Sequence, residues 1–526
     1  MSIFKKVLKI TGLVLSILTV SAVVFAYGNS RDRHRGYHLD LKIRSAGDAP
    51  IRTGFAAVTI TPEVPDRWHD NDGDSRYNPK KGDTYDDLNG NGKFDAYWIA
   101  GFGNKVAANG IHDDLWARTM VIDDGKTRMA IVSVDVIGMF HSVVLDIRNM
   151  LPEKAGITYL TVVSTHVHEA PDMLGVWGKS VLKCGVDKQW REYIKQRVVQ
   201  SVMEAVDNMR PSILKFSQNL TDGMVTLGDT REPHIYDPGL RMMQAVDAED
   251  GHTLGTFIQW SNHPETLWGR NLLLTSDFPH YIREAVEKGV YNGETLVEQG
   301  VGGVAVYVNG AIGGLMTTHS SKGVKDPFSD TVYVKPSFDK ARAQGDTIGM
   351  IILRAMRDKP VEVKEAGISL RAKTFKVPIS NQIFRLGTFL GVLDTHMSGW
   401  MKKRTEGAVW SIGPASFLQI PGELYPEILN GGIDALPGRD YKKIEPVETP
   451  PLRELMSGDF RFAVGLANDE IGYIIPKSQW DKKAPFVYRD KAYYGESNSM
   501  GPETAPVVHR ELAEMIKDLS VNSVNY

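Results

Sequence analysis

Two apolar segments of this chain end in histidine. Residues 159–164 are rich in β-branched side chains and lead into Ser-Thr-His166-Val-His168. Side chains two residues apart on an extended chain face the same side. The two imidazoles can therefore converge on one ion, or divide into a metal ligand and a proton donor. Residues 257–260 lead in the same way to His263 in the segment Asn-His-Pro-Glu.

A carboxylate completes the set. Glu423 follows Ile-Pro-Gly, which is typical of a turn. Each group alone is a weak signal, because a lone histidine is more often hydrogen-bonded structure and Pro-Gly-Glu is common at surfaces. Together His166, His263 and Glu423 form a His, His, Glu set, which is known to hold catalytic zinc and to leave a position open for water. Cys184 is the single cysteine, which excludes an internal disulfide and restricts metal ligands to nitrogen and oxygen.

An acidic insertion at residues 66–95 predicts a second kind of metal site. It carries eight Asp and five Lys or Arg, so its net charge is 5 − 8 = −3. Asp87, Asn89, Asn91 and Asp95 stand at positions 1, 3, 5 and 9 of a calcium-type loop, with glycine at position 6. Position 12 lacks the usual bidentate Glu, although a second acidic cluster at 70–74 lies nearby. We predict a structural Ca²⁺ site; the alternative is a solvated loop with turn chemistry alone.

The elements that must position these groups alternate between strand and helix patterns. Residues 129–136, 159–164, 255–260 and 304–308 are expected to be strands, and residues 189–208, 340–357 and 511–519 to be helices. Residues 361–377 alternate polar and apolar side chains, which is typical of half-exposed antiparallel strands. The fold class is therefore α/β, with a large mixed β-sheet flanked by helices. No Pro-rich linker divides residues 51–526, so we expect one domain.

The composition and the N-terminal segment limit the cellular compartment and the kinds of partner that we expect for this protein. The chain has 526 residues, 42% of them hydrophobic, and a formal charge of −3, which argues against nucleic acid as a partner. Three lysines precede an apolar run at 10–26, and Val24 and Ala26 fit a signal-peptidase site. Residues 1–26 are therefore expected to be a signal peptide or a membrane anchor, and residues 27–50 a polar tether. Either reading predicts an extracytoplasmic protein, whose membrane association would depend on this segment. The sequence does not indicate the oligomeric state.

Several blocks of the chain resemble the neutral/alkaline non-lysosomal ceramidase family and its bacterial members. They occur in the family's order and cover most of residues 54–510. The blocks are residues 54–62 (Gly-Phe-Ala-Ala-Val-Thr-Ile-Thr-Pro), 101–103 (Gly-Phe-Gly), 110–118, 132–135 (Val-Ser-Val-Asp), 164–168 (Ser-Thr-His-Val-His), 465–468 (Gly-Leu-Ala-Asn) and 501–502 (Gly-Pro). The resemblance implies the α/β fold of the family's N-terminal catalytic domain. We expect a fold without the C-terminal sandwich domain of characterised ceramidases.

The resemblance also implies roles for individual residues. His166, His263 and Glu423 match the family's zinc ligands, and Tyr473 matches its tyrosine ligand, whose phenol can also hold the oxyanion. His168 matches a histidine that contacts the substrate amide. Arg231 stands where the family has a substrate-orienting arginine; its alternative is an ordinary surface charge.

Two departures from the family pattern affect the chemistry. Gly314 occupies a position where the family has a serine, which excludes a serine nucleophile there. Glu169 follows His168 where the family has small residues, and it is a candidate for carrying a proton to the leaving amine.

These observations predict a zinc-dependent amidohydrolase that acts on a linear amide, such as a ceramide-like N-acyl lipid, through a metal-activated water. The cofactors expected are Zn²⁺ and a structural Ca²⁺, and the substrate is a small-molecule or lipid amide. Two alternatives remain open. One is a non-catalytic, calcium-stabilised envelope protein that retains the fold, and the other is a zinc esterase.

Overall fold

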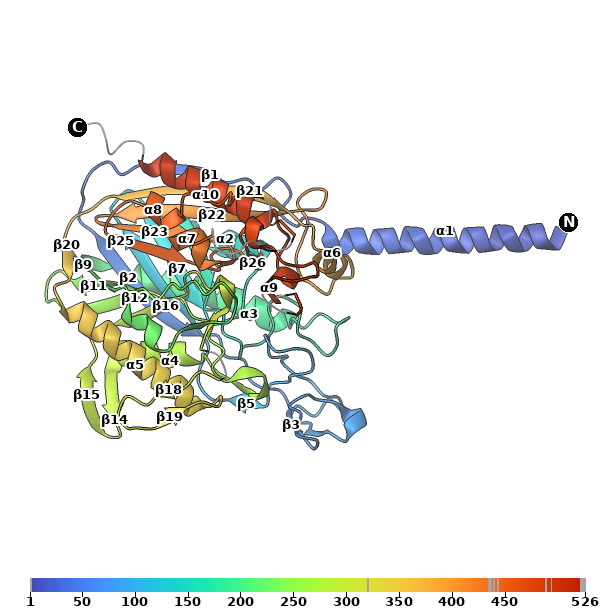
Figure 1. Cartoon of the computed structure of the whole chain (residues 1–526), viewed down its shortest axis with the longest axis horizontal. Helices are drawn as coiled ribbons and strands as arrows, with labels where there is room; N and C mark the ends of the chain where they lie inside the picture. The colour runs from blue at the N-terminus through green and yellow to red at the C-terminus, as the bar shows by residue number, and fades with distance from the viewer. Residues whose placement is uncertain are drawn as a thin grey trace.

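The computed structural model describes residues 2–318, 321–433, 438, 440–441, 444–487, 490–492 and 494–520. Two β-sheets pack face to face, and helices cover the outer face of each (Figure 1). The four-layer arrangement buries apolar side chains on both faces of each sheet, which explains why so many strands are apolar along their whole length.

The larger sheet has nine strands and is mixed, as the sequence predicts. Its order is β16 (Val304–Val308), β12 (Thr253–Gln259), β11 (Leu240–Asp247), β9 (Arg210–Asn219), β2 (Arg52–Thr59), β6 (Trp116–Asp123), β7 (Arg128–Val134) and β8 (Tyr159–Ser164), with β20 (Val361–Val363) also paired to β9. The β7–β8 and β12–β16 pairs are parallel, and the others are antiparallel.

This sheet bends at the junction of its two halves. Strands β2 and β9 pair only through Arg52 with Pro211 and Thr53 with Arg210. Beyond that short contact the halves turn toward one another, so that β16 lies against β6 and β7. The bend brings the ends of β8 and β12 together, although five strands lie between them in the sheet order.

The smaller sheet consists of β1 (Asp40–Ile43), β21 (Ile368–Pro378), β22 (Lys402–Ile412), β23 (Ala415–Gln419) and β25 (Phe460–Val464). Aromatic rings fill the space between the two sheets. Phe417 stacks on Trp410 with 3.8 Å between ring centroids and on Phe462 at 4.4 Å, and it meets Phe257 of the larger sheet at 5.8 Å. Full burial of each such side chain stabilises the fold by roughly 1.5–3 kcal/mol.

Helices α3 (Lys188–Asp207), α4 (Phe278–Lys288) and α5 (Phe338–Arg357) cover the larger sheet, and α10 (Thr504–Ser520) covers the smaller one with α7 (Pro426–Asn430) and α8 (Leu452–Leu455) (Figure 1). The helices expected at 189–208 and 340–357 are present. Side chains cap both: Asp187 accepts a hydrogen bond from the Trp190 amide, and Ser337 accepts one from the Lys340 amide. The helix expected at 511–519 begins earlier, at Thr504.

The remaining elements are short and lie at the strand ends. They are the strand pairs β3 (Arg67–His69) with β4 (Thr84–Asp86), β5 (Gly110–Ile111) with β13 (Leu273–Leu274), β10 (Gly228–Asp229) with β17 (Met316–Thr317), β14 (Gly289–Asn292) with β15 (Thr295–Gln299), β18 (Val324–Lys325) with β19 (Val332–Tyr333), β24 (Glu423–Leu424) with β26 (Tyr473–Ile474), and the helices α2 (His141–Met150), α6 (Gln382–Phe389) and α9 (Tyr494–Ser497).

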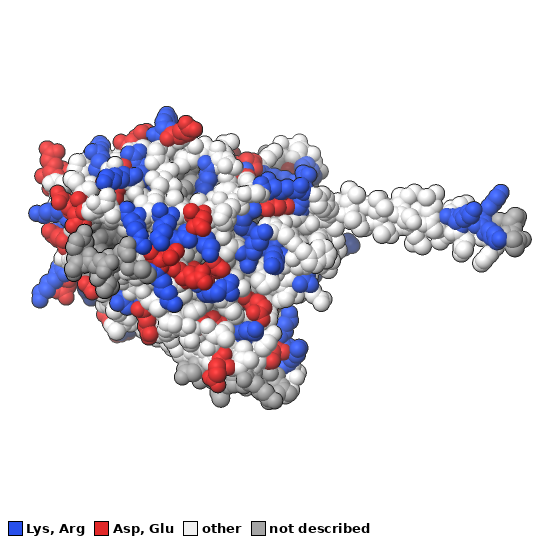
Figure 2. Space-filling model, turned by 90° about the horizontal axis from the view of Figure 1, so that it is seen from above, with Lys and Arg blue, Asp and Glu red and all other residues white. Residues whose placement is uncertain are grey.

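The N-terminal helix α1 (Ser2–Ser30) projects away from the body (Figure 1). It continues past Ala26 without a break, and its 29 residues span about 43 Å at 1.5 Å per residue. Its apolar window has a mean hydropathy of 2.2, and none of that window is buried. The shaft between its lysine-bearing tip and the body is uncharged (Figure 2). Length and composition therefore suit a membrane span, and they are equally compatible with a signal peptide.

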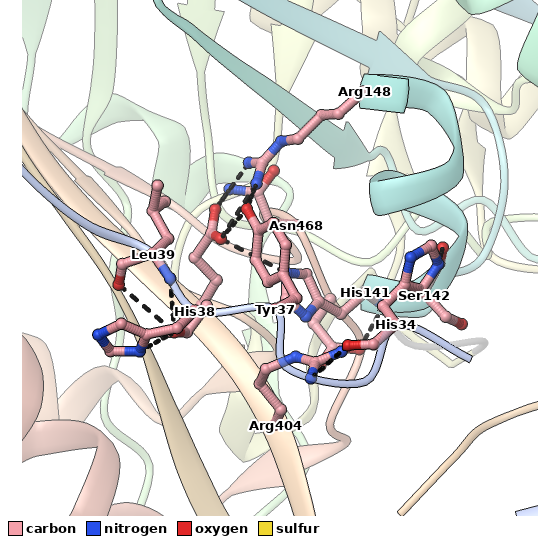
Figure 3. A network of polar contacts seen from close by, with 12 residues as sticks. His34, Tyr37, His38, Leu39, His141, Ser142, Arg148, Arg404 and Asn468 are labelled. Atoms are coloured by element: carbon pink, nitrogen blue, oxygen red, sulfur yellow. Dashed lines mark hydrogen bonds and ion pairs between the residues drawn. The ribbon is translucent and has the colours of Figure 1, made fainter. Parts of the chain in front are cut away.

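The polar segment 27–50, expected to be a tether, is packed against the body. Residues 40–43 form β1, whose backbone pairs with β21. Asp32 forms an ion pair with Arg404 at 2.8 Å. Figure 3 shows His34 and Tyr37 of this segment among body side chains such as Arg148. Within β1 the polar Asp40 and Lys42 are exposed and the apolar Leu41 and Ile43 are half-buried, as expected of an edge strand.

Candidate metal centre

The turns after β8 and β12 carry His166 and His263. His166 has a φ of 66°, in the left-handed region that residues other than glycine rarely adopt. Such strained backbone persists only where neighbouring groups hold it. Buried Asp135 provides one such group, because it accepts a hydrogen bond from the Thr165 hydroxyl at 3.1 Å and pairs with Arg283 through two contacts of 3.0 Å. The Val-Ser-Val-Asp135 block thus supports the His166 turn.

Backbone carbonyls determine which nitrogen of each histidine is free. The Nδ1 atom of His166 lies 2.6 Å from the Ile137 oxygen, and that of His263 lies 2.6 Å from the Met316 oxygen. A carbonyl only accepts hydrogen bonds, so Nδ1 donates in both rings. The Nε2 atom of His166 then keeps its lone pair, whereas the Nε2 atom of His263 lies within hydrogen-bond distance of Glu423. This is the usual arrangement around metal-binding histidines. Both Nε2 atoms face the Glu423 carboxylate, whose Oε2 is 3.6 Å from His166 and 3.0 Å from His263.

Glu423 and Tyr473 are neighbours across two short parallel strands. β24 and β26 pair with Glu423 directly opposite Tyr473, and both side chains are buried. The structure thus brings together all four residues that the sequence singles out as zinc ligands.

A further carboxylate, Glu470, lies beside them. Its Oε1 accepts a hydrogen bond from the Gly472 amide, whereas its buried Oε2 has no hydrogen-bond partner. One ligand atom each from His166, Glu423 and Glu470 lies within 4.8 Å of the others. Sequence reasoning missed Glu470, although its position between the Gly-Leu-Ala-Asn468 block and Tyr473 was a usable signal.

His168 lies beside the other two histidines, with its ring centroid 4.9 Å from that of His166 and 5.9 Å from that of His263. Its Nδ1 lies 3.5 Å from Oε2 of Glu265, and neither ring nitrogen has a hydrogen-bond partner. Glu265 is a second carboxylate that the sequence analysis left without a role. Glu169, the predicted proton carrier, is buried but does not line the cavity described below. Burial, followed by the charge of Asp277, raises the pKa of Glu169 well above its usual range.

The electrostatics of the cluster suit a cation. Burial, and then the neighbouring histidines, lowers the pKa of His166 well below its usual value, so this imidazole is neutral at pH 7. Burial also lowers the pKa of His168. For His263 burial acts in the same direction, but the hydrogen bond to Glu423 outweighs it and raises the pKa. The neutral imidazole of His166, clustered carboxylates and a buried oxygen without a partner fit a metal ion, and the nitrogen and oxygen donors suit zinc.

The cluster lies in a cavity of about 300 Å³. Its walls are mainly apolar and aromatic, and Tyr473 and Tyr494 approach the cluster from one side. The other large wall residues are Phe102, Phe140, Leu174, Trp177, Trp268, Leu315, Phe384 and Leu393. Such a shape suits an apolar ligand that presents one polar group to the metal centre.

Arg231 and Gly314 lie outside the cavity lining. Arg231 is buried, which rules out an ordinary surface charge. Its guanidinium pairs with Glu496 at 3.3 Å and lies 4.8 Å from the ring centroid of Tyr425, so it supports the wall behind Tyr473. A substrate contact of Arg231 stays a prediction. Gly314 has a φ of 70° and lies near Asp229.

The predicted calcium loop is held together by its own side chains. Asp87 accepts hydrogen bonds from the Asn91 and Gly92 amides, and the side-chain amides of Asn89 and Asn91 donate to Asp95. These contacts match the turn chemistry of the alternative reading. Calcium binding at this loop stays a prediction.

The second acidic cluster contains a cation of its own. Asp70, Asp72 and Asp74 bring ligand atoms within 4.8 Å of one another. Lys81 Nζ lies 2.9 Å from Asp72 and 2.5 Å from Asp74, so it already balances part of their charge.

Fold and site together define a mixed α/β protein with a His/Glu cluster that could hold a metal ion in an apolar cavity. Residues 91–318 match the family described as neutral/alkaline non-lysosomal ceramidase, N-terminal. The match confirms the family resemblance predicted from the motifs. It includes both histidine turns, whereas Glu423 and Tyr473 lie beyond it. A metal-dependent hydrolase is the class that this family supports.

Two solved structures share the fold. Neutral ceramidase from Pseudomonas aeruginosa is 17% identical with a TM-score of 0.61, and the alignment covers 90% of this chain and 75% of that one. A ceramidase complexed with C2 is 16% identical with a TM-score of 0.60, covering 90% of this chain and 76% of that one. The predicted fold class is thereby confirmed.

Proposed function

We propose that this protein is a zinc-dependent amidohydrolase whose substrate is a ceramide-like N-acyl lipid. The observation that carries the proposal is that the Nε2 atoms of His166 and His263 both face Glu423 in the lining of an apolar cavity. His166, His263, Glu423 and Tyr473 would hold the metal. Zinc bound there would supply a Lewis acid that polarises a carbonyl and makes water acidic enough to attack it.

The residues around the centre have separate tasks. The aromatic wall holds the acyl chain and excludes water, which strengthens polar interactions inside. Burial, and then the charge of Glu423, raises the pKa of Tyr473 well above its usual value. Its hydroxyl is therefore protonated at pH 7 and can donate a hydrogen bond to an oxygen that gains negative charge.

His168 and Glu265 are placed to move a proton. Both line the cavity, and His168 Nδ1 faces the Glu265 carboxylate at 3.5 Å. A leaving amine needs a proton, and such a pair can carry one to a nitrogen within reach of the imidazole. This assignment replaces Glu169, which does not line the cavity.

The proposed amide specificity is supported by the similarity to a neutral ceramidase. The zinc esterase and the non-catalytic envelope protein make different predictions. An esterase would hydrolyse N-acyl amides far more slowly than the matching esters. A non-catalytic protein would hydrolyse neither, with or without added zinc.

The experiment compares metal content and turnover in the full chain and two variants. Wild type should contain roughly one zinc per chain, and His166→Ala should lose it. His252→Ala is the matched control, because the exposed His252 belongs to a separate group with Asp247 and Asp250 that could also hold a metal. It should keep both zinc and turnover of a fluorogenic N-acyl amide. Equal zinc in wild type and His166→Ala would refute the metal assignment, and amide turnover that survives complete chelation would refute the role of zinc.

A further inference from the structure

Helix α6 presents an apolar face to solvent. Ile383, Leu386 and Leu390 lie three and four residues apart, so they share one side of the helix. Their exposed fractions are 67%, 59% and 43%. Trp400, on the segment that follows, is 86% exposed. Contiguous exposed apolar residues of this size usually mark a surface that contacts another molecule or a membrane.

The base of α1 is fixed to the same region. α1 packs against α6, the Asn29 side-chain amide donates to the Phe389 carbonyl at 3.0 Å, and the Met397 amide donates to the Ser30 carbonyl at 2.9 Å. A groove of about 900 Å³ beside this joint is lined by Tyr27 and Trp400, among others. The apolar shaft of α1 therefore leaves the body next to the exposed face of α6 (Figure 1).

The charge of this region differs from that of the whole chain. Residues 27–35 and 376–404 together contain eight Lys or Arg and two Asp, a net charge of 8 − 2 = +6, whereas the chain carries −3. Arg31, Lys376 and Lys402 are exposed. Basic side chains beside an apolar helix face are attracted to anionic lipid headgroups, and tryptophan favours the same interface.

The cavity reaches the surface beside α6. His166 and His263 lie at its buried end, whereas the half-buried Phe384 of α6 lines it together with the buried Leu393. Across from them the cavity is lined by Val176, which is partly exposed. The two sides are joined by the Asp394 amide, which donates to the Leu174 carbonyl at 3.1 Å. The helix that lines the cavity thus also carries the exposed apolar face.

We propose that α6 and residues 390–402 rest in the headgroup region of the bilayer that α1 crosses, and that a lipid substrate passes directly from this bilayer into the cavity. The occupant of the apolar face is the membrane itself, because the helix that suits a membrane span leaves from this face and its basic side chains complement anionic headgroups. The identity of the lipid as an amide rests on the proposed function, whereas the membrane contact does not.

Fluorescence from the full chain in vesicles of phosphatidylcholine and phosphatidylglycerol tests the contact. In a Cys184→Ser background, Leu386→Cys carries an NBD label, and Leu296→Cys is the control. Leu296 is 40% exposed on β15, away from α1 and α6 (Figure 1). The label at position 386 should shift to the blue and be quenched by nitroxide lipids, and the label at position 296 should do neither. Equal responses at the two positions would overturn the proposal.

Turnover tests the entry route. In the same vesicles, Leu386→Glu should slow hydrolysis of a long-chain amide about tenfold, since burial of one leucine side chain is worth about that factor. A water-soluble short-chain amide should be hydrolysed at the wild-type rate, and Leu296→Glu should match wild type on both substrates. An equal loss on both substrates would overturn the entry route. If wild type hydrolyses neither, the proposed function fails, while the label at position 386 still decides the membrane contact.

Discussion

Replacing Asn309 with alanine should weaken metal binding without removing a metal ligand. Asn309 is buried at the end of β16. Its side-chain amide donates to the Thr165 carbonyl, and its oxygen accepts from the Asn262 amide at 3.3 Å and the Tyr307 hydroxyl at 3.1 Å. Thr165 and Asn262 immediately precede His166 and His263. One side chain thus joins the two turns that carry the histidines.

The magnitude follows from these contacts. The substitution leaves the Thr165 carbonyl and the Asn262 amide buried without this partner, and each such loss costs about 1–3 kcal/mol. The Tyr307 hydroxyl can still donate to the Trp260 carbonyl, 3.2 Å away, so its contribution is smaller. We expect the free energy of unfolding to fall by about 2–4 kcal/mol. Zinc affinity should fall by roughly 10–100-fold, the usual effect of losing a group that orients ligands.

Urea unfolding of the zinc-free protein and competition for zinc with a chromophoric chelator measure the two effects. The control is Asn208→Ala, which removes one hydrogen bond, to the Phe55 carbonyl at 3.1 Å, at the end of α3. It should lower stability by about 1 kcal/mol and leave zinc affinity unchanged. Wild-type zinc affinity in Asn309→Ala, or an equal loss in the control, would refute the idea that Asn309 holds the two turns together.

Two further substitutions test the surroundings of the site. Gly101 has a φ of 103°, and a Cβ added there would lie 2.5 Å from Nδ1 of His168. Gly101→Ala should therefore displace the His168 ring and lower amide turnover about tenfold or more. Its zinc content should stay at the wild-type level. Gly36→Ala, at a φ of 79° with open space around it, is the control, and equal turnover in the two variants would contradict this role. Burial raises the pKa of Asp229 to about 8, outweighing the hydrogen bonds from backbone amides. Between these two pKa values the folded protein keeps a proton on Asp229 that the unfolded chain releases. The stabilisation from this proton is fully present below the ordinary Asp pKa of about 4, and it is lost as the pH rises through the raised pKa of the folded protein. The free energy of unfolding of wild type should therefore fall between pH 5 and pH 8, and in Asp229→Asn it should fall less. Urea unfolding at both pH values measures this, and an equal pH dependence in the two proteins would contradict the prediction.

Local patterns predicted the elements well. The strands expected at 159–164 and 304–308 have those bounds in the structure, because runs of β-branched residues buried on both faces mark their own length. Segment 361–377 forms two strands, β20 and β21, with Lys364–Gly367 between them, since β20 pairs with the larger sheet and β21 belongs to the smaller one. Alternation within the segment could not show which sheet each part joins.

The site was predicted in part. His166, His263, Glu423 and Tyr473 were named from motifs, and they lie together in the structure. Glu265 and Glu470 lie next to these motifs in the sequence but were given no role, because a carboxylate close in sequence to a metal ligand is as often a solvated side chain as a part of the site. The burial of Arg231 and its ion pair with Glu496 could not be predicted, because Glu496 lies more than 250 residues later and no local pattern connects the two residues.

The sequence by itself determined the kinds of ligand atom available, the turns that present them, and an apolar N-terminal helix. The tertiary structure decided which of these groups meet. The bend between β2 and β9 brings His166 to His263, and the packing of the second sheet places Glu423 against both. It also placed α6 at the base of α1, some 350 residues away in the chain. The physical reason is that side-chain periodicity reports which face of one element is apolar, whereas contacts between distant segments depend on how whole faces pack.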